Sequence, residues 1–296
     1  MYEADSSVAC AASVAPLSFP DAVTNKFDML LANAGEWAKG PHDKSNWLIK
    51  NRVLVGGWPF RLPRGRGSPG ESQAEGTNKL KSLLAAGVAT FVSLTEPLEI
   101  RGKPFCLATF MGAATTLHAQ MFGPRRCCKK ACSELRFLRC PMPDGGVTSD
   151  LDLAGLLQQL IDEIGSNRVV YVHCYGGHGR AGIVGCALLC LYFHVTAEMA
   201  VEAFNTLHAE RLVCGVGGPA LFPHSARQLE QVERVAKRVG AFEGLLRHMT
   251  MPDLDAGSLA KDLYSDMPEA LPVHEHAGSF NRQEEGNAKH TDHHNC

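Results

Sequence analysis

The sequence lacks an excess of either charge. Its 296 residues include 29 lysines and arginines against 31 aspartates and glutamates, so the formal net charge at pH 7 is −2. A chain so evenly balanced has no global field that would attract nucleic acid or an anionic membrane surface. Composition therefore predicts no nucleic-acid partner, and the charged content of 20% is that of an ordinary globular protein.

Long hydrophobic runs are also missing. The longest apolar stretch, residues 183–193, is too short to cross a bilayer. The N-terminus carries Glu3 and Asp5 and no basic segment followed by an apolar run, which argues against a secretory signal. Cys296 is the last residue and cannot head a prenylation box. These absences predict a protein of the cytoplasm or nucleus with no membrane span, and we expect a monomer.

No even, regularly spaced set of cysteines is present. The 11 cysteines follow no disulfide framework, which predicts a reducing compartment and small buried side chains. Cys127, Cys128 and Cys132 lie among basic residues, and one hypothesis joins them with Cys106 or Cys140 in a zinc site. Structural zinc sites usually pair two short cysteine knuckles, and a second knuckle is lacking. We therefore expect a basic surface loop and no metal.

Helical and buried-strand patterns alternate along the chain, which predicts an α/β fold with a central, mostly parallel sheet flanked by helices. The short apolar runs predict strands at 47–49, 53–55, 90–94, 136–140 and 169–172. Helical spacing predicts helices at 78–86, 151–164, 181–193, 196–207 and 222–239, with a short helix near 27–36.

Three regions are expected from this pattern. Residues 1–40 predict a flexible N-terminal region, and residues 41–248 predict one domain. Within that domain, residues 99–135 have no clear period and indicate an inserted basic, cysteine-containing loop. The polar, His-rich residues 249–296 predict a disordered tail.

The most informative segment follows the strand predicted at 169–172. It is a tight loop that begins with Cys174, ends with Arg180 and opens an apolar helix. The residues between them, which we expect to surround a bound phosphate, are Tyr175, Gly176, Gly177, His178 and Gly179. Free backbone N–H groups and a planar guanidinium aimed at one small volume suit a tetrahedral oxyanion. We therefore expect phosphate binding here.

The loop also carries a nucleophile. An ordinary thiol is only about 3% ionised at pH 7, and a helix N-terminus, glycine N–H groups and Arg180 all favour the thiolate. Full ionisation raises the fraction of thiolate only roughly 30-fold. Most of the rate acceleration must therefore come from stabilising the charge on the transferred phosphoryl group. The leaving oxygen needs a proton, and Asp144 in the upstream PDGG turn is the expected donor. Asp150 and Asp152 are nearer a helix start and fit capping better.

Together these motifs resemble the cysteine-dependent protein tyrosine phosphatases. HCYGGHGRAG resembles their phosphate loop, and CPMPDGG their general-acid loop. The likeness covers roughly residues 45–240 and is closest to the small dual-specificity group that includes the cyclin-dependent kinase-associated phosphatases. It implies that Cys174 is the nucleophile, Arg180 the phosphate clamp and Asp144 the general acid. PHSARQLEQV resembles the helix that bears a water-positioning glutamine, which would be Gln228.

One position departs from that family. A hydroxyl residue usually follows the arginine and eases departure of the thiolate, but Ala181 stands here. The second step, hydrolysis of the phosphoenzyme, is therefore expected to be slow. His173 is expected to orient the loop by hydrogen bonding, and a disulfide between Cys140 and Cys174 under oxidation is a further hypothesis. No cofactor is needed for the mechanism.

Two other functions compete with a phosphatase. Residues 177–182 match the G-x-G-x-x-G pattern of dinucleotide-binding folds, which also needs a strand ending in an acid about 20 residues on. The sequence near residue 200, TAEMAVEAF, is helical, so the strand that a dinucleotide-binding fold requires is missing there. The other rival is a phosphatase-like module that binds phosphoproteins without turning them over. We favour a phosphatase acting on phosphotyrosine and, in a wider specificity, phosphoserine or phosphothreonine, because Tyr175 and His178 stand where inositol-phosphate-directed relatives often carry lysines.

Overall fold

The computed structural model describes residues 27–28, 30–61, 70–97, 99, 106–123, 134–212 and 222–238. All of these residues belong to the first of two units into which the chain divides, Met1–Thr250 and Met251–Cys296. The expected His-rich tail and the cysteines at 127, 128 and 132 lie outside the described residues, so those predictions stay untested.

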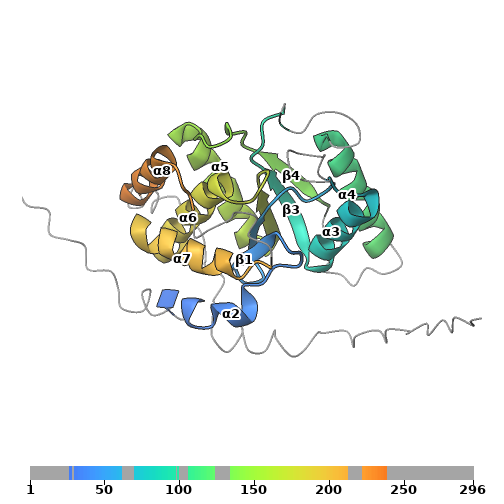
Figure 1. The fold of residues 1–296 in the computed structure, drawn as a ribbon, viewed down its shortest axis with the longest axis horizontal. Coiled ribbons are helices and arrows are strands. Elements are labelled where there is room, and N and C mark those ends of the chain that lie inside the picture. Colours follow the sequence, from blue (N-terminus) through green and yellow to red (C-terminus); the bar gives the residue numbers. More distant parts are fainter. Residues whose placement is uncertain are drawn as a thin grey trace, which may run out of the picture. The chain divides into compact units, whose positions relative to one another are not determined.

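A five-stranded sheet forms the centre of the fold, as expected (Figure 1). Its first two strands form an antiparallel hairpin, and the other neighbours are parallel. Across the sheet, the strands are β1 (Ser45–Ile49), β2 (Val53–Gly56), β5 (Val169–His173), β3 (Val88–Ser93) and β4 (Arg136–Arg139). Because β5, β3 and β4 are parallel neighbours, their carboxyl ends meet at one edge, where open α/β sheets place their ligands.

Helices cover both faces of the sheet. Apart from the connection between β3 and β4, the helices and strands follow the order expected from the sequence. The helices are α2 (Ala34–Trp37), α3 (Gln73–Ala85), α4 (Leu107–Phe122), α5 (Asp150–Gly165), α6 (Gly179–Phe193), α7 (Ala197–Ala209) and α8 (Ala226–Lys237). No single helix of the described residues is long and apolar enough to cross a membrane; only α6 and α7 counted together, across a 119° bend, have the length and composition.

The strands divide the apolar interior into two cores. On one face, Val55 and Val172 pack among the apolar residues of α5 to α8. On the other face, Leu54 and Tyr171 pack among those of α3 and α4. Figure 1 shows the two groups of helices on opposite sides of the sheet. Alternate residues of a strand point to opposite faces, so β2 and β5, which are covered on both faces, are apolar apart from Tyr171 and His173.

The prediction of a loop throughout 99–135 was wrong, because α4 occupies residues 107–122. Small and apolar residues occupy nearly every side of this helix, and Gly112 and three threonines interrupt them, so its sequence has no visible period. Phe110 and Ala114 are the residues that it buries. Residues 124–133, which contain the basic cysteine-rich segment, lie outside the described residues.

Two predicted boundaries also shift. The last helix was expected to begin at residue 222, but Ser225 caps it and its side chain accepts from the Gln228 N–H, so α8 begins at Ala226. At the other end, Phe27 and Ala38 are buried in the same core as α6. The predicted domain start at residue 41 therefore falls inside the packed part of the chain.

Candidate active site

The loop between β5 and α6 places Cys174 against the start of a helix. The Cys174 side chain is buried, and its Sγ accepts a hydrogen bond from the Gly177 N–H at 3.1 Å. Gly177 has a φ of +79°, and a Cβ at this position would lie 2.3 Å from the Gly56 carbonyl carbon. Only glycine fits there. The chain after Cys174 therefore turns tightly enough to direct the Gly177 N–H at the thiol.

Strand β2 holds the outer side of this loop. The Trp58 N–H donates to the Tyr175 carbonyl at 3.0 Å, and the Tyr171 hydroxyl donates to the Gly57 carbonyl at 2.6 Å. Tyr175 itself is 37% exposed, so its ring lies at the rim of the site. Burial raises the pKa of Tyr175, and the charges of Glu71 and Glu99 add to that rise. The ring stays neutral and can contact a substrate.

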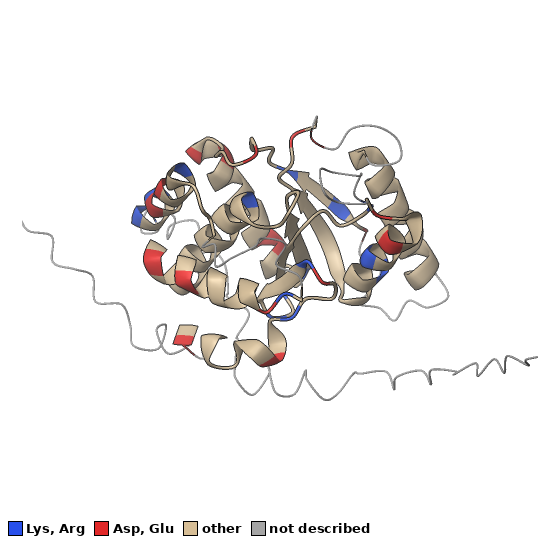
Figure 2. Ribbon diagram, viewed as in Figure 1, with Lys and Arg blue, Asp and Glu red and all other residues tan. Residues whose placement is uncertain are grey.

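Arg180 is the buried cation of the site and the only charged residue of α6, which is otherwise tan in Figure 2. Both of its Nη atoms bind the Glu99 carboxylate, Nη2 at 2.9 Å from Oε2. Nη1 also donates to the Met142 carbonyl at 3.1 Å, and Nη2 lies 3.0 Å from Asp144. Burial alone would lower the pKa of Arg180, but hydrogen bonding to Glu99 and nearby negative charges outweigh it and raise that pKa. Within the described part of the chain, the Nε–H has no partner.

Asp144 lies beside Arg180. A residue that protonates the leaving group of a phosphate ester bound at Cys174 is expected in this position. It occupies a turn closed by the Gly146 N–H on the Pro143 carbonyl at 2.9 Å, and its side chain is 84% exposed. The two rival carboxylates lie in the first turn of α5 and have other partners. Asp152 accepts a hydrogen bond from the N-cap Ser149, and Asp150 forms an ion pair with Arg234. The structure thus brings Cys174, Arg180 and Asp144 together, and their catalytic roles stay predictions.

His173 lies beneath the nucleophile and is fully buried. Burial lowers the pKa of His173 to about 3, with a small opposing effect from the Cys174 backbone. Among the described residues, neither ring nitrogen has a hydrogen-bond partner of normal geometry. The ring instead contacts Trp58, Phe110 and Tyr171 at centroid distances of 5.3, 5.8 and 5.7 Å. Aromatic packing, not the expected hydrogen bond, positions this neutral side chain.

His178 anchors the far side of the loop. Its Nδ1 lies 2.8 Å from Nε2 of His208 on α7, and its ring stacks on Phe222 at 4.7 Å. Burial, followed by the charge of Arg211, lowers the pKa of His178 to about 4 and that of His208 to about 2. Both rings are neutral at physiological pH. One of them donates and the other accepts, which joins the phosphate loop to α7.

Two positions raised by the family resemblance lie at the loop. Gln228 is buried, donates to the Gly146 carbonyl at 3.1 Å and would meet a Cβ at Gly179 at 2.9 Å. It therefore lies between the phosphate loop and the acid loop, and its role toward water stays a prediction. Ala181 is fully buried and offers only a methyl group.

The hypothesis of a Cys140–Cys174 disulfide does not fit the sheet. Cys174 follows β5 and Cys140 follows β4, and β3 lies between these strands. Two strand spacings separate such residues by about 10 Å, whereas bridged Cα atoms lie about 4.4–6.8 Å apart. The two thiols need a backbone movement to meet. As for metals, the described residues contain no group of three or more His, Cys, Asp or Glu side chains placed to hold an ion.

Glu99 is the site residue that sequence reasoning missed. It stands in TEPLEI, a few residues after β3, with no motif around it. Its ion pair with Arg180 arises because β3 and β5 are adjacent and parallel, so that their following segments share an edge. The one sequence feature that could have pointed to Glu99 is that it is an acidic residue soon after a buried parallel strand.

The fold and this cluster are similar to those of cysteine-dependent phosphatases. Residues 69–213 match the family described as "Swiss Army Knife protein, DSP-PTPase phosphatase domain". This part of the chain is therefore similar to DSP-PTPase domains.

Relatives and solved structures carry related names. The chain is 22% identical over 173 residues to "Putative tyrosine phosphatase 067L" of Invertebrate iridescent virus 3, which covers 57% of this chain and 55% of that protein. It is 34% identical over 68 residues to "Cyclin-dependent kinase inhibitor 3" of Sus scrofa, covering 23% and 32% of the two chains. Thus it spans about half of the viral protein's length. Among solved structures, PTPMT1 in complex with PI(5)P is similar, with 19% identity, 68% and 99% of the two chains covered and a TM-score of 0.45.

Proposed function

We propose that this protein hydrolyses phosphate monoesters of proteins, chiefly phosphotyrosine, through a cysteinyl-phosphate intermediate. One observation carries the proposal: Arg180, Asp144 and the Cys174 loop converge at the carboxyl edge of the sheet. The Nε–H of Arg180 and the loop N–H groups are available to the phosphoryl oxygens. Localisation in the cytoplasm or nucleus remains a prediction.

The first step transfers the phosphoryl group. The Cys174 thiolate attacks phosphorus, the bond from phosphorus to the leaving oxygen breaks, and Asp144 gives that oxygen a proton. Arg180 and the N–H groups stabilise the charge of the transferring group, which is the largest contribution. In the second step Asp144 takes a proton from water, the water oxygen bonds to phosphorus, and the P–S bond breaks to return the thiolate.

Substrate class follows from the rim of the loop. Neither Tyr175 nor His178 gives the loop a positive charge, and the His178 ring is hydrogen-bonded to His208. A highly charged inositol phosphate would therefore meet few cations within the loop itself. The partly exposed Tyr175 ring suits an aromatic or peptide surface instead. Phosphoproteins are thus the proposed partners.

Purified protein should hydrolyse p-nitrophenyl phosphate, and Cys174→Ser should abolish turnover. Cys106→Ser is the matched control, because Cys106 lies at the start of α4 outside the loop. A panel of phosphotyrosine and phosphothreonine peptides and a phosphoinositide then ranks the substrates. Activity that survives Cys174→Ser, or a preference for the phosphoinositide, would overturn the proposal.

A phosphoprotein-binding module is the second candidate, and Ala181 is the observation that favours it. Without a hydroxyl near the thiol, the phosphoenzyme would persist and turnover would be slow. A burst of one p-nitrophenol per protein followed by a slow steady state indicates a slow enzyme. Stable binding of phosphopeptide with no burst indicates the module.

A further inference from the structure

One face of α8 runs along the acid loop and binds it at four successive places. Ser225 Oγ donates to the Gly145 carbonyl at 3.2 Å, and Gln228 Nε2 donates to the Gly146 carbonyl at 3.1 Å. One turn further, Gln231 Nε2 donates to the Thr148 carbonyl at 2.7 Å. Ser225 is the N-cap of α8, and Gln228 and Gln231 follow it at intervals of three, so the three residues share one face of the helix.

An ion pair continues this row at the end of the loop. Arg234 binds the carboxylate of Asp150 through two nitrogens, Nε at 2.9 Å from Oδ2 and Nη2 at 3.1 Å from Oδ1. Gln231 Nε2 also lies 3.2 Å from Asp150 Oδ1, and Arg238 Nη1 lies 3.4 Å from Oδ2. The hydrogen bond from Arg234 is the main reason that the pKa of Asp150 is lowered, and the carboxylate is charged at neutral pH.

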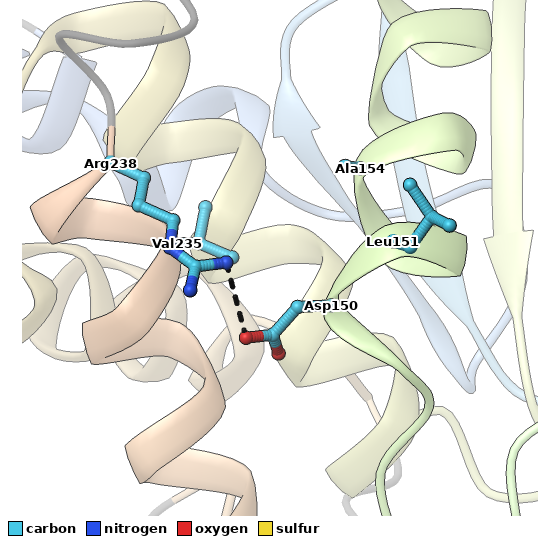
Figure 3. Close-up of a pocket in the computed structure, with 5 residues that line it drawn as sticks. All are labelled: Asp150, Leu151, Ala154, Val235 and Arg238. Carbon is cyan, nitrogen blue, oxygen red and sulfur yellow. Dashed lines mark hydrogen bonds and ion pairs between the residues drawn. The ribbon is translucent and has the colours of Figure 1, made fainter.

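Figure 3 shows the contact between Arg238 and Asp150 in this cluster. Asp150 and Leu151 begin α5, Val235 and Arg238 face them from α8, and a hollow of about 200 Å³ opens between the two helices. In Figure 2 the basic residues of α8 lie next to the acidic start of α5. The Arg234–Asp150 pair is partly open to water, with 42% of the Arg234 side chain and 25% of the Asp150 side chain exposed. A contact of this kind can be broken without emptying the core.

The other end of the loop is attached to the sheet and to Arg180. The buried Met142 donates its N–H to the Leu94 carbonyl at 3.0 Å, its carbonyl accepts from Arg180, and Asp144 reaches the same guanidinium. Beyond Asp144, Gly145 has a φ of +69° and open space where a Cβ would lie, so other backbone conformations are open to it. The position of Asp144 therefore depends on the attachments on both sides of the turn, and the attachment after the glycines is made by α8.

We propose that Arg234 and Gln231 are positioning residues that fix the general acid by tying the far end of its loop to α8. This inference rests on the proposed phosphatase function. Loss of the tie lets the loop spread over more positions, and Asp144 is then less often placed to protonate the leaving oxygen. Phosphate binding and thiolate attack are left intact, because Cys174 and Arg180 have other supports.

The leaving group makes the test specific. Phenyl phosphate releases a phenol whose pKa of about 10 is that of tyrosine, so its departure needs a proton. p-Nitrophenol is a much stronger acid and leaves with little help. Because kcat/KM reports phosphoryl transfer to Cys174 and not the later hydrolysis, it is the quantity to compare. For Arg234→Met we expect kcat/KM on phenyl phosphate to fall by about tenfold, a fraction of the full general-acid contribution. On p-nitrophenyl phosphate we expect kcat/KM to change by less than about twofold, and the inhibition constant of inorganic phosphate should stay constant.

Arg227→Met is the matched control. Arg227 is an exposed arginine of the same helix without an ion pair or hydrogen bond to the described residues, and its variant should match the wild type on both substrates. Asp150→Asn breaks the pair from the other side and should reproduce the leaving-group effect, so the test survives even if Arg234→Met folds poorly. Arg234→Lys should restore part of the phenyl phosphate rate.

Equal losses on the two substrates, or wild-type rates in both Arg234→Met and Asp150→Asn, would overturn the inference. The underlying function is checked separately by Asp144→Ala. If that variant shows the leaving-group effect and the α8 variants do not, only the positioning role fails. If the wild type hydrolyses neither substrate, or Asp144→Ala has no such effect, the proposed mechanism itself fails.

Discussion

Two clusters of arginine and carboxylate lie at opposite edges of the same sheet, and they are built in opposite ways. At the amino edge, the buried carboxylate of Glu163 binds Arg136, Arg168 and the hydroxyl of Thr90. At the carboxyl edge, the buried guanidinium of Arg180 binds the carboxylates of Glu99 and Asp144. The first is an acid surrounded by bases, and the second is a base surrounded by acids.

The difference lies in what each cluster leaves open. Around Glu163 every oxygen is bound, and Arg168 also donates to the Ala89 and Glu134 carbonyls at 2.8 Å each. Among the described residues, Arg180 keeps an unpartnered Nε–H, and one of its acids, Asp144, is 84% exposed on a glycine-containing turn. A satisfied cluster stabilises the fold, whereas a cluster with a spare donor and an exposed acid is suited to bind and change a phosphate.

The largest effect expected from this contrast is that of Arg180→Lys. A lysine keeps the charge but loses the planar pair of donors, so it cannot bind Glu99 and phosphate together. We expect kcat/KM on p-nitrophenyl phosphate to fall by about 10³-fold, as when a main charge-stabilising donor is removed. The melting temperature should change little. A loss below tenfold would show that the loop N–H groups, not the guanidinium, carry the stabilisation.

Glu163→Gln should have the reverse profile. It leaves Arg168, whose side chain is only 13% exposed, without its anion, and we expect a loss of about 2 kcal/mol in the free energy of unfolding. Because this cluster lies at the other edge of the sheet, kcat of the folded fraction should stay constant. Urea denaturation and steady-state kinetics on the same sample test both statements, and a fall in kcat without loss of stability would contradict them.

Glu99→Gln tests whether Glu99 orients the Arg180 guanidinium or competes with the substrate for it. If Glu99 orients the guanidinium, the weaker amide contact leaves the cation mobile, and we expect KM and the inhibition constant of inorganic phosphate to rise by about tenfold. If instead Glu99 competes with the substrate for Arg180, phosphate will bind more tightly in the variant. Glu71→Gln is the matched control, since Glu71 pairs with Lys44 and Lys79 away from Arg180.

A third cluster, the neutral His178–His208 pair, makes the loop sensitive to acid. The pKa values of these rings, about 4 and about 2, lie below the unfolded value of about 6.5, so the unfolded chain binds protons that the folded chain refuses. Stability is therefore complete above pH 6.5 and falls as the pH drops from there toward 4. His208→Phe should flatten this loss by about 1 kcal/mol per pH unit in urea denaturation at pH 7 and pH 5.5. An unchanged slope would contradict the burial of a neutral ring.

The parts of the site that the sequence predicted are those with a local cause. Cys174 and Arg180 lie on one turn, and Asp144 lies in a recognisable glycine turn, so spacing alone pointed to them. The order of the elements followed from apolar period, except for α4, whose residues are apolar on nearly every side.

What the sequence did not predict depends on which strands become neighbours. Glu99 reaches Arg180 only because β3 lies beside β5. The α8 face binds the acid loop mainly through backbone carbonyls, which any residue possesses, so no motif marks the receiving side. Contacts of this kind become visible only once the sheet order is known.

The smallest expected effect belongs to Ala181→Ser, and it returns to the contrast between the two edges. At the amino edge a hydroxyl, that of Thr90, donates to the buried acid. At the carboxyl edge the residue after Arg180 has only a methyl, and the hydrogen bond that the described residues give the Cys174 thiol comes from the Gly177 N–H. A serine hydroxyl would add a second donor and make the thiolate a better leaving group, so the second step should accelerate. We expect steady-state kcat to rise by about threefold, the worth of a modest hydrogen bond, and the burst to shrink. A flat or lower kcat would show that phosphoenzyme hydrolysis is not the slow step.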